Sequence, residues 1–296
     1  MAVYIYVYGW WTKPYFAWPL TTIYSDGTWT TDITTGGADQ QATQIAAFLL
    51  PNGYTPPAMS GGQALPAELY TQAADYVIAD RPAVLRTIQF SGYTWNVKQS
   101  DTPAGPGPNY FSDAESDVWV DGDGALHLKI AWRDGRWYCT EIINTVSLGY
   151  GSYEFTLASR VDQLDANAVL GLFTWDNTAP EFHYREIDIE FSRWGIPINQ
   201  NAGYVVQPYD TSGNLHRFDF ALADGVSRHS FNWQANGVQF TSQQGETVLQ
   251  SWDYTGGDIP PPGIENARLN LWLNNGVAPA NGQEIEVVVN SFQFTP

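Results

Sequence analysis

Three acidic residues alternate with apolar ones at positions 186–191, in the sequence Glu-Ile-Asp-Ile-Glu-Phe. Because the side chains of a β-strand point alternately to its two faces, a strand here places all three carboxylates on one face. Like charges at this spacing repel one another, and negative neighbours raise the pKa of a carboxyl group. A protonated carboxyl group beside an ionised one is what hydrolysis of a glycosidic bond requires. A solvated strand face and a calcium site are the alternative interpretations.

Strand signals around this segment favour an all-β fold. From about residue 85, short alternating segments recur between turns at the spacing of roughly 8–12 residues that is typical of a sandwich or barrel. No fixed-period repeat is present, which excludes propellers and solenoids. We therefore expect an antiparallel jelly-roll β-sandwich at 85–296. Its expected strands are 87–93, 126–132, 136–142, 150–160, 169–175, 186–191, 202–207, 215–221, 229–233, 238–242, 268–273 and 284–294.

Residues 1–84 differ in texture and are expected to form a small, mainly β accessory domain. Their tryptophans are Trp10, Trp11, Trp18 and Trp29, which suit either a carbohydrate-binding surface or the domain's own core. Residues 66–80 have apolar residues every three to four positions, which predicts a helix. Because helices usually end before a proline, we expect the domain boundary near Arg81-Pro82.

Composition limits the partners of the chain. Its 296 residues include 31 acidic and 13 basic ones, a formal net charge of −18. Nucleic acids and anionic membranes need basic surfaces and are therefore excluded as partners. Hydrophobic residues make up 44% of the chain and aromatic residues 15%, which excludes disorder. No apolar run approaches the roughly 18 residues of a membrane span.

Cysteine content and the first residues bear on location and cofactors. Cys139 is the only cysteine, so the chain has no internal disulfide and no cysteine-based metal site. Residues 1–8 alternate like a strand and lack the basic start of a signal peptide. We expect a secreted or extracellular monomer whose signal peptide is not in this sequence, and no cofactor. The cluster Asp117, Asp121 and Asp123 fits either a structural calcium site or ordinary Asp-Gly turns.

Residues 186–190 resemble the Glu-x-Asp-x-Glu motif of the family sixteen glycoside hydrolases, in the lichenase form rather than the longer laminarinase form. Segments 148–154, 170–175, 228–233 and 268–272 resemble further strands of that family, and the resemblance covers about residue 90 to the C-terminus. It implies a jelly roll whose concave face carries the motif strand.

The resemblance implies that Glu186 is the nucleophile, Glu190 the acid/base and Asp188 the electrostatic helper between them. On a flat strand the Cα atoms of Glu186 and Glu190 would lie about 13 Å apart, whereas a retaining pair needs carboxyl groups about 5–5.5 Å apart. We therefore expect a strongly curved, concave catalytic face. Tyr184 and Arg185 replace a tryptophan and an acid of the family pattern. We expect the side chain of Arg185 to point away from the acids.

Substrate-binding residues are expected from the same segments, because sugar rings stack on aromatic faces. Core packing is the alternative for each tryptophan, and a structural position is the alternative for the histidine. The expected substrate-binding residues are Trp175, Tyr184, Trp194, Asn270, Trp272 and His229.

The sequence thus predicts a retaining endo-β-glycosidase that hydrolyses a neutral β-glucan with β-1,3-1,4 or β-1,3 linkages by double displacement. A galactan-directed hydrolase of the same family is an alternative. A second is a non-catalytic polysaccharide-binding protein with vestigial acids. A third is a polysaccharide lyase that uses His183 or Tyr184 as base, but a lyase needs a uronate substrate, which the net charge of −18 disfavours.

Overall fold

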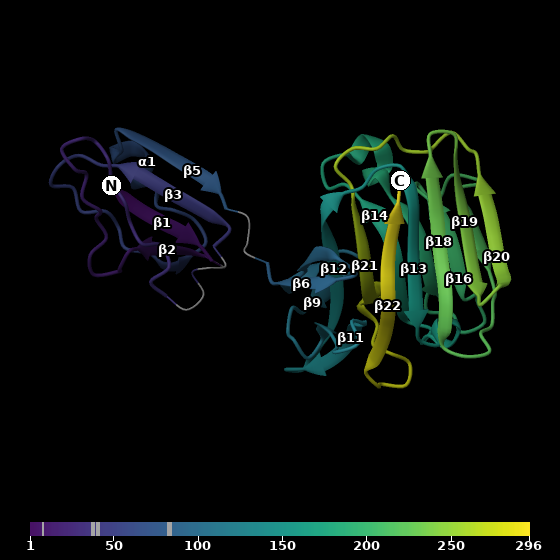
Figure 1. The fold of residues 1–296 in the computed structure, drawn as a ribbon. Coiled ribbons are helices and arrows are strands. Elements are labelled where there is room, and N and C mark those ends of the chain that lie inside the picture. The colour runs from purple at the N-terminus through teal and green to yellow at the C-terminus, as the bar shows by residue number, and fades with distance from the viewer. Residues whose placement is uncertain (8, 37–38, 40–41, 82–84) are drawn as a thin grey trace. The chain divides into compact units, whose positions relative to one another are not determined.

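The computed structural model describes residues 1–7, 9–36, 39, 42–81 and 85–296. The chain divides into two compact units, residues 1–84 and 85–296 (Figure 1). The boundary expected near Arg81-Pro82 and the end of the expected strand 1–8 fall partly outside the described residues. Within the described ranges, no helix is long and apolar enough to cross a membrane.

The first unit is an antiparallel sheet in the order β4-β2-β1-β3-β5, with one short helix. Its core contains Tyr4, Trp10, Phe48 and Leu69. The elements are β1 (Ala2–Tyr6), β2 (Trp10–Lys13), β3 (Gln44–Leu49), β4 (Ser60–Gly62), α1 (Ala67–Gln72) and β5 (Asp75–Asp80).

The helix predicted over 66–80 is wrong beyond residue 72. Residues Asp75–Asp80 form β5 and pair antiparallel with β3, with Val77 opposite Ala47 and Ile78 opposite Ala46. The run Tyr-Val-Ile at 76–78 is rich in residues that favour strands, and pairing with a neighbouring strand outweighs the weak helical spacing.

The second unit is a sandwich of two sheets. Sheet I has the order β6 (Thr87–Phe90), β7 (Tyr93–Val97), β12 (Arg136–Ser147), β21 (Asn266–Leu273), β14 (Ala168–Trp175), β15 (Ile187–Ser192), β16 (Ala202–Val206) and β17 (Leu215–Phe218). Sheet II has the order β10 (Val118–Val120), β11 (Leu126–Arg133), β22 (Ile285–Thr295), β13 (Gly151–Ala158), β18 (Val226–Gln234), β19 (Gly237–Gln244) and β20 (Thr247–Tyr254).

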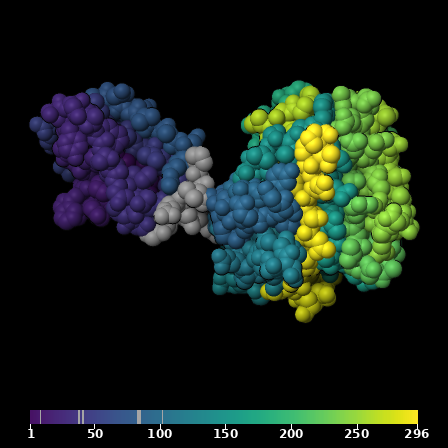
Figure 2. All heavy atoms as spheres, viewed as in Figure 1, coloured from purple at the N-terminus to yellow at the C-terminus, as the bar shows by residue number. Residues whose placement is uncertain are grey.

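The two sheets are continuous through β11 and β12. Of two further short strands, β9 (Asn109–Phe111) pairs with β12, and β8 (Ser100–Ala104) pairs with β9. In Figure 2, β22 forms a yellow stripe on the visible face of this unit, with blue and teal atoms on one side and teal and then green atoms on the other. The predicted jelly-roll sandwich is confirmed by this architecture.

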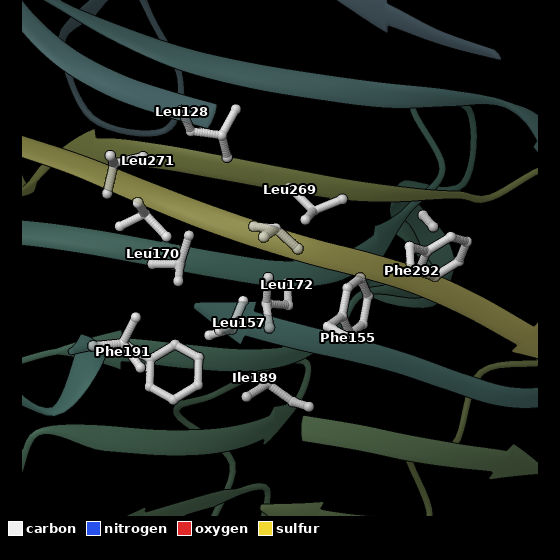
Figure 3. Packing of buried hydrophobic residues seen from close by; sticks show 14 of the residues in the cluster. Leu128, Phe155, Leu157, Leu170, Leu172, Ile189, Phe191, Leu269, Leu271 and Phe292 are labelled. Carbon is white, nitrogen blue, oxygen red and sulfur yellow. The ribbon is translucent and has the colours of Figure 1, made fainter. Parts of the chain in front are cut away.

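One hydrophobic core fills the space between the sheets. Leu170, Leu172, Ile189 and Phe191 from sheet I face Phe155 and its neighbours on sheet II (Figure 3). On β14 and β15 every second side chain points into this core. The side chains between them therefore point to the opposite face of sheet I. That opposite face carries the candidate site.

The strand predicted over 87–93 is interrupted. It is a hairpin of β6 and β7, with Ser91 (φ 52°) and Gly92 (φ 81°) in the turn. Two consecutive residues with positive φ are typical of the tight turn that matches the twist of two hairpin strands.

Candidate active site

The three acids at 186–190 line one cleft on the outer face of sheet I. On β15, Ile189 is fully buried in the core, whereas Asp188 and Glu190 are directed to the opposite face; Glu186 immediately precedes the strand. The cleft has a volume of about 280 Å³. Its other lining residues are Lys98, Gly105, Pro106, Glu141, Gly171, Phe173, Trp175, Asn177, Arg268, Asn270 and Trp272.

Glu190 lies between two glycines on the neighbouring strands. It pairs with Gly171 of β14 and with Gly203 of β16. A Cβ at position 171 would lie 2.5 Å from Oδ1 of Asn270, and a Cβ at position 203 would lie 3.1 Å from Cδ and Nη1 of Arg217. The two glycines therefore leave the space that these polar side chains occupy on either side of Glu190.

Arg217 is held in place from β17. Its Nη2 donates to the carbonyl oxygen of Ser192 at 2.6 Å and to that of Gln200. Its Nη1 is buried and has no hydrogen-bond partner in the described part of the chain. Its positive charge attracts the Glu190 carboxylate. Arg217 is thus a fixed cation that acts on one of the three acids.

A tight turn positions Glu186. Residues Pro180–Arg185 form the 3₁₀ segment η3, which ends directly before Glu186. Within it His183, Tyr184 and Arg185 have φ values of 50°, 59° and 53°. Non-glycine residues in this left-handed region cost about 1–3 kcal/mol each, and they persist only where surrounding contacts determine them.

Contacts on both sides of Glu186 hold that turn. Nε of Arg185 lies 3.0 Å from Oδ2 of Asp176, in an ion pair that is largely buried. The Thr174 hydroxyl donates to the Arg185 carbonyl oxygen at 2.8 Å and accepts from the backbone N–H of Ile187 at 3.2 Å. The Arg185 side chain thus pairs with Asp176, in keeping with its expected direction away from the three acids.

The three carboxyl groups have raised pKa values. Burial raises the pKa of Glu190 to about 7, against the lowering effect of Arg217. Burial and the charges of Glu186 and Glu190 raise the pKa of Asp188. Burial and the charge of Glu190 raise the pKa of Glu186 to about 8, although its hydrogen bond with Asp188 and the charge of Arg268 lower it. The shared hydrogen bond therefore favours the proton on Asp188 and the charge on Glu186.

A second ionic cluster lies at the β12 and β21 side of the cleft. Glu141 is 1% exposed and accepts from Lys98 at 2.8 Å and from Arg268 at 3.3 Å. The charge of Arg268 also acts on Glu186. This cluster therefore connects the nucleophile candidate to charged groups on two further strands.

Sequence reasoning missed Lys98, Glu141, Arg217 and Arg268. Arg268 could have been found, because it alternates with apolar residues on the same strand as Asn270 and so shares the Asn270 face. Arg217 carries no local signal. It comes close to Glu190 only through the register of β15, β16 and β17.

Trp175, Asn270 and Trp272 line the cleft, and the predicted neighbours Tyr184 and Trp194 contact the two tryptophans. Tyr184 stacks on Trp175 with ring centroids 4.4 Å apart and an interplanar angle of 6°. Trp194 meets Trp272 edge-on at 5.8 Å. Oδ1 of Asn270 accepts from the N–H of Gly171 at 3.1 Å, which fixes its amide beside Glu190. Tyr184 and Trp194 thus support the lining rings rather than lining the cleft themselves.

His229 was predicted to bind substrate, and this is wrong. It is completely buried on β18 of sheet II, where its ring nitrogens bond the hydroxyls of Ser242 at 2.7 Å and Ser227 at 2.8 Å. Burial lowers its pKa to about 3. A strand position that alternates inward in sheet II places its side chain in the core, away from the cleft. His183 is exposed and is not a lining residue either.

The acids considered for calcium have other partners. Asp117 pairs with Arg133 at 2.5 Å, and Asp121 pairs with His127 at 3.1 Å. Across the described ranges, no three side chains of histidine, cysteine, aspartate or glutamate gather in a way that could hold a metal ion.

Comparisons with known proteins bear on the fold. No protein-family model matches the sequence, and no curated protein does. Solved structures do match: a Bacillus licheniformis β-glucanase is 18% identical, with a TM-score of 0.52 over 68% of this chain and 92% of that one. A β-1,3-glucanase from Mycobacterium marinum is 18% identical, with a TM-score of 0.51 over 68% and 90%.

A third match is an immunostimulatory antigen of Mycobacterium tuberculosis described as a pseudo β-1,3-glucanase. It is 17% identical, with a TM-score of 0.52 over 66% of this chain and 88% of that one. At these identities the likeness concerns the fold. The expected resemblance therefore holds at that level: this chain has the jelly-roll fold of the family sixteen type of β-glucanases.

Proposed function

We propose that this chain is a retaining endo-β-glycosidase that hydrolyses a neutral β-glucan with β-1,3-1,4 or β-1,3 linkages. The observation that carries the proposal is the row of Glu186, Asp188 and Glu190 in one cleft, with raised pKa values for all three. The β-glucanase fold supports the same conclusion.

In the proposed reaction, Glu190 donates its proton to the leaving glycosidic oxygen while Glu186 attacks the anomeric carbon. A covalent glycosyl-enzyme results, and water deprotonated by Glu190 then releases the sugar with the original anomeric configuration. A pKa of about 7 suits Glu190 to donate and accept a proton near neutral pH. The hydrogen bond with Asp188 and the charge of Arg268 favour the ionised form of Glu186, against the burial that raises its pKa to about 8.

The lining of the cleft supports a neutral sugar polymer as substrate. Trp175 and Trp272 offer flat apolar surfaces for pyranose rings, and Asn270 offers a hydrogen-bonding group beside Glu190. The two cations in the cleft, Lys98 and Arg268, are both paired with Glu141. A polymeric substrate of this kind implies that the enzyme is secreted and acts outside the cell.

Reducing-sugar release tests the proposal on a panel of lichenan, laminarin, xyloglucan, agarose and carrageenan. We expect release from lichenan or laminarin, and a loss of at least about a thousandfold in kcat for Glu186→Gln with the fold intact. Glu246→Gln, in the exposed turn between β19 and β20, is the matched control and should keep full activity. Undiminished activity in Glu186→Gln would refute the assignment.

The same panel separates the alternatives. Retention of a polysaccharide without any release would favour a non-catalytic binding protein, an outcome given weight by the neighbour described as a pseudo β-1,3-glucanase. Release from agarose or carrageenan alone would favour a galactan-directed hydrolase. Proton NMR of the first products tests the retaining mechanism, because an inverting enzyme would give the opposite anomer.

A further inference from the structure

The tryptophans of the first unit fall into two groups. Trp10 is 6% exposed and belongs to the core. Trp18 is 71% exposed, Trp11 41% and Trp29 38%. The core interpretation of these residues therefore applies to Trp10 alone. An exposed tryptophan forgoes the favourable free energy of burying a large apolar side chain, so a group of them on one surface calls for a function.

Trp18 and Phe16, the two most exposed aromatic residues in the described part of the first unit, lie on one tight turn that follows β2. The N–H of Trp18 donates to the carbonyl oxygen of Tyr15 at 3.1 Å and closes the turn. The rings of Tyr15 and Trp18 meet edge-on, with centroids 6.0 Å apart. Phe16, between them, is 60% exposed and Tyr15 is 51% exposed. A backbone turn of four residues thus displays three aromatic rings to solvent.

A groove runs beside this turn. We call it the aromatic groove; it is lined by Trp11, Thr12, Lys13, Pro14, Tyr15, Phe16, Thr35, Gly36, Met59 and Ser60. The indole N–H of Trp11 donates to the Val7 carbonyl oxygen at 3.0 Å, and its ring lies over Gly61. The orientation of the Trp11 ring is therefore fixed before any ligand arrives, which reduces the entropy lost on binding.

Polar groups in the aromatic groove are hydroxyls rather than available charges. Lys13 is the only charged residue among those that line it, and its Nζ is paired with Asp39 in a largely buried ion pair. The Thr12 hydroxyl is buried and accepts from the N–H of Met59 at 2.6 Å, whereas Ser60 on the same groove is exposed and offers its hydroxyl to a ligand. The groove thus combines flat apolar rings with hydroxyl groups and no unpaired charge among its lining residues.

That combination selects a neutral glycan among the ligands that aromatic surfaces bind. The apolar face of a pyranose ring stacks on an aromatic ring, and its hydroxyls bond to polar neighbours at the edge. The first unit carries six acidic and two basic residues, which disfavours nucleic acids and anionic lipids. We propose that the aromatic groove and Trp18 bind a neutral polysaccharide, and so hold the second unit on the polymer that it cleaves.

The second half of this proposal rests on the proposed function, whereas glycan binding by the groove does not. Two linked sites on one polymer raise the apparent affinity, because binding at the second becomes intramolecular. A groove variant should therefore lose activity on an insoluble polymer and keep activity on a short soluble oligosaccharide, which occupies the cleft alone.

Retention on insoluble β-1,3-glucan tests the groove in the full chain, with Glu186→Gln as background so that the polymer is not degraded. We expect Trp18→Ala and Phe16→Ala each to weaken retention by about threefold to tenfold. Tyr24→Ala removes another ring of the first unit that is 59% exposed but belongs neither to the groove lining nor to the turn of residues 15–18, and it should leave retention unchanged. Phe16 lines the groove and Trp18 lies on the turn beside it; both are exposed, so both variants should fold.

Equal retention of the groove variants and Tyr24→Ala on β-1,3-glucan, lichenan and agarose would overturn the proposal. Two other outcomes would also overturn it: the substitutions at Trp18 and Phe16 abolish only the binding of phosphatidylcholine vesicles, or they abolish only the formation of a dimer seen by light scattering. Failure of the proposed function gives a different pattern. Trp18→Ala and Phe16→Ala would still lose retention, whereas the protein with an intact Glu186 would release no reducing sugar.

Discussion

At the scale of single residues, burial and the charge of Arg217 act in opposite directions on the protonation of Glu190, the acid/base candidate. Burial raises the pKa of Glu190, and the guanidinium of Arg217 opposes that rise. Gly203, which pairs with Glu190, leaves room for the Arg217 side chain, because a Cβ at that position would lie 3.1 Å from Cδ and Nη1 of Arg217. The charge of Arg217 is therefore a determinant of the pH at which Glu190 loses its proton.

Arg217→Met should shift the alkaline limb of the pH profile of kcat/KM to higher pH. The sign follows because the first step needs protonated Glu190, and removal of a nearby positive charge favours the protonated form and raises its pKa. Kinetics across pH 5–10 on a soluble glucan measure the shift. Arg217→Lys keeps the charge and should keep the limb near its original position.

Arg228→Met serves as the matched control for that experiment, because Arg228 lies on sheet II with its side chain 46% exposed and paired with Glu154. Its profile should not move. An alkaline limb that stays in place in Arg217→Met would show that the Arg217 charge does not reach Glu190 in solution, and would leave burial as the dominant influence on that carboxyl group.

At the scale of elements, the turn η3 depends on Asp176. This carboxylate is 2% exposed, pairs with Arg185 and accepts the N–H and hydroxyl of Thr178 at 2.9 and 2.7 Å. Removing one partner of a buried ion pair is strongly destabilising, by about 3–5 kcal/mol. Because Glu186 directly follows the turn, a change in its geometry also moves the proposed nucleophile.

Asp176→Ala should lower the free energy of unfolding by about 3–5 kcal/mol and reduce kcat tenfold or more at temperatures where the variant is fully folded. Thermal unfolding by circular dichroism and single-temperature kinetics measure the two effects separately. Asp253→Ala, at an exposed position on β20, should change neither. A destabilised variant with normal kcat would mean that the turn contributes stability without positioning Glu186.

The strand β15 and the turn η3 show which features can be predicted from the sequence and which cannot. Alternation identifies β15 and the burial of Ile187 and Ile189, because a period of two is a property of the strand itself. It does not give three consecutive left-handed residues in η3, since the residue types of Tyr184 and Arg185 do not favour positive φ; tertiary contacts impose it. His229 was misassigned for a related reason, because its face depends on which side of sheet II meets the core.

At the scale of the whole molecule, each described hydrophobic cluster lies within one of the two units. One large cluster lies wholly within residues 85–296, and the smaller clusters around Phe48 and Ile5 lie within the first unit. A unit with its own core can fold alone. The cleft, its three acids and the residues that hold them all come from the second unit.

The fragment 85–296 should therefore fold and hydrolyse a short soluble glucan oligosaccharide with kcat within about twofold of the full chain, because every group that lines the cleft is retained. On insoluble β-1,3-glucan the same fragment should be slower than the full chain, since the aromatic groove is missing. Both rates, measured beside a circular dichroism melt of each protein, test the prediction. A folded fragment that loses activity on the soluble oligosaccharide would mean that the first unit contributes to the reaction itself rather than to contact with the polymer.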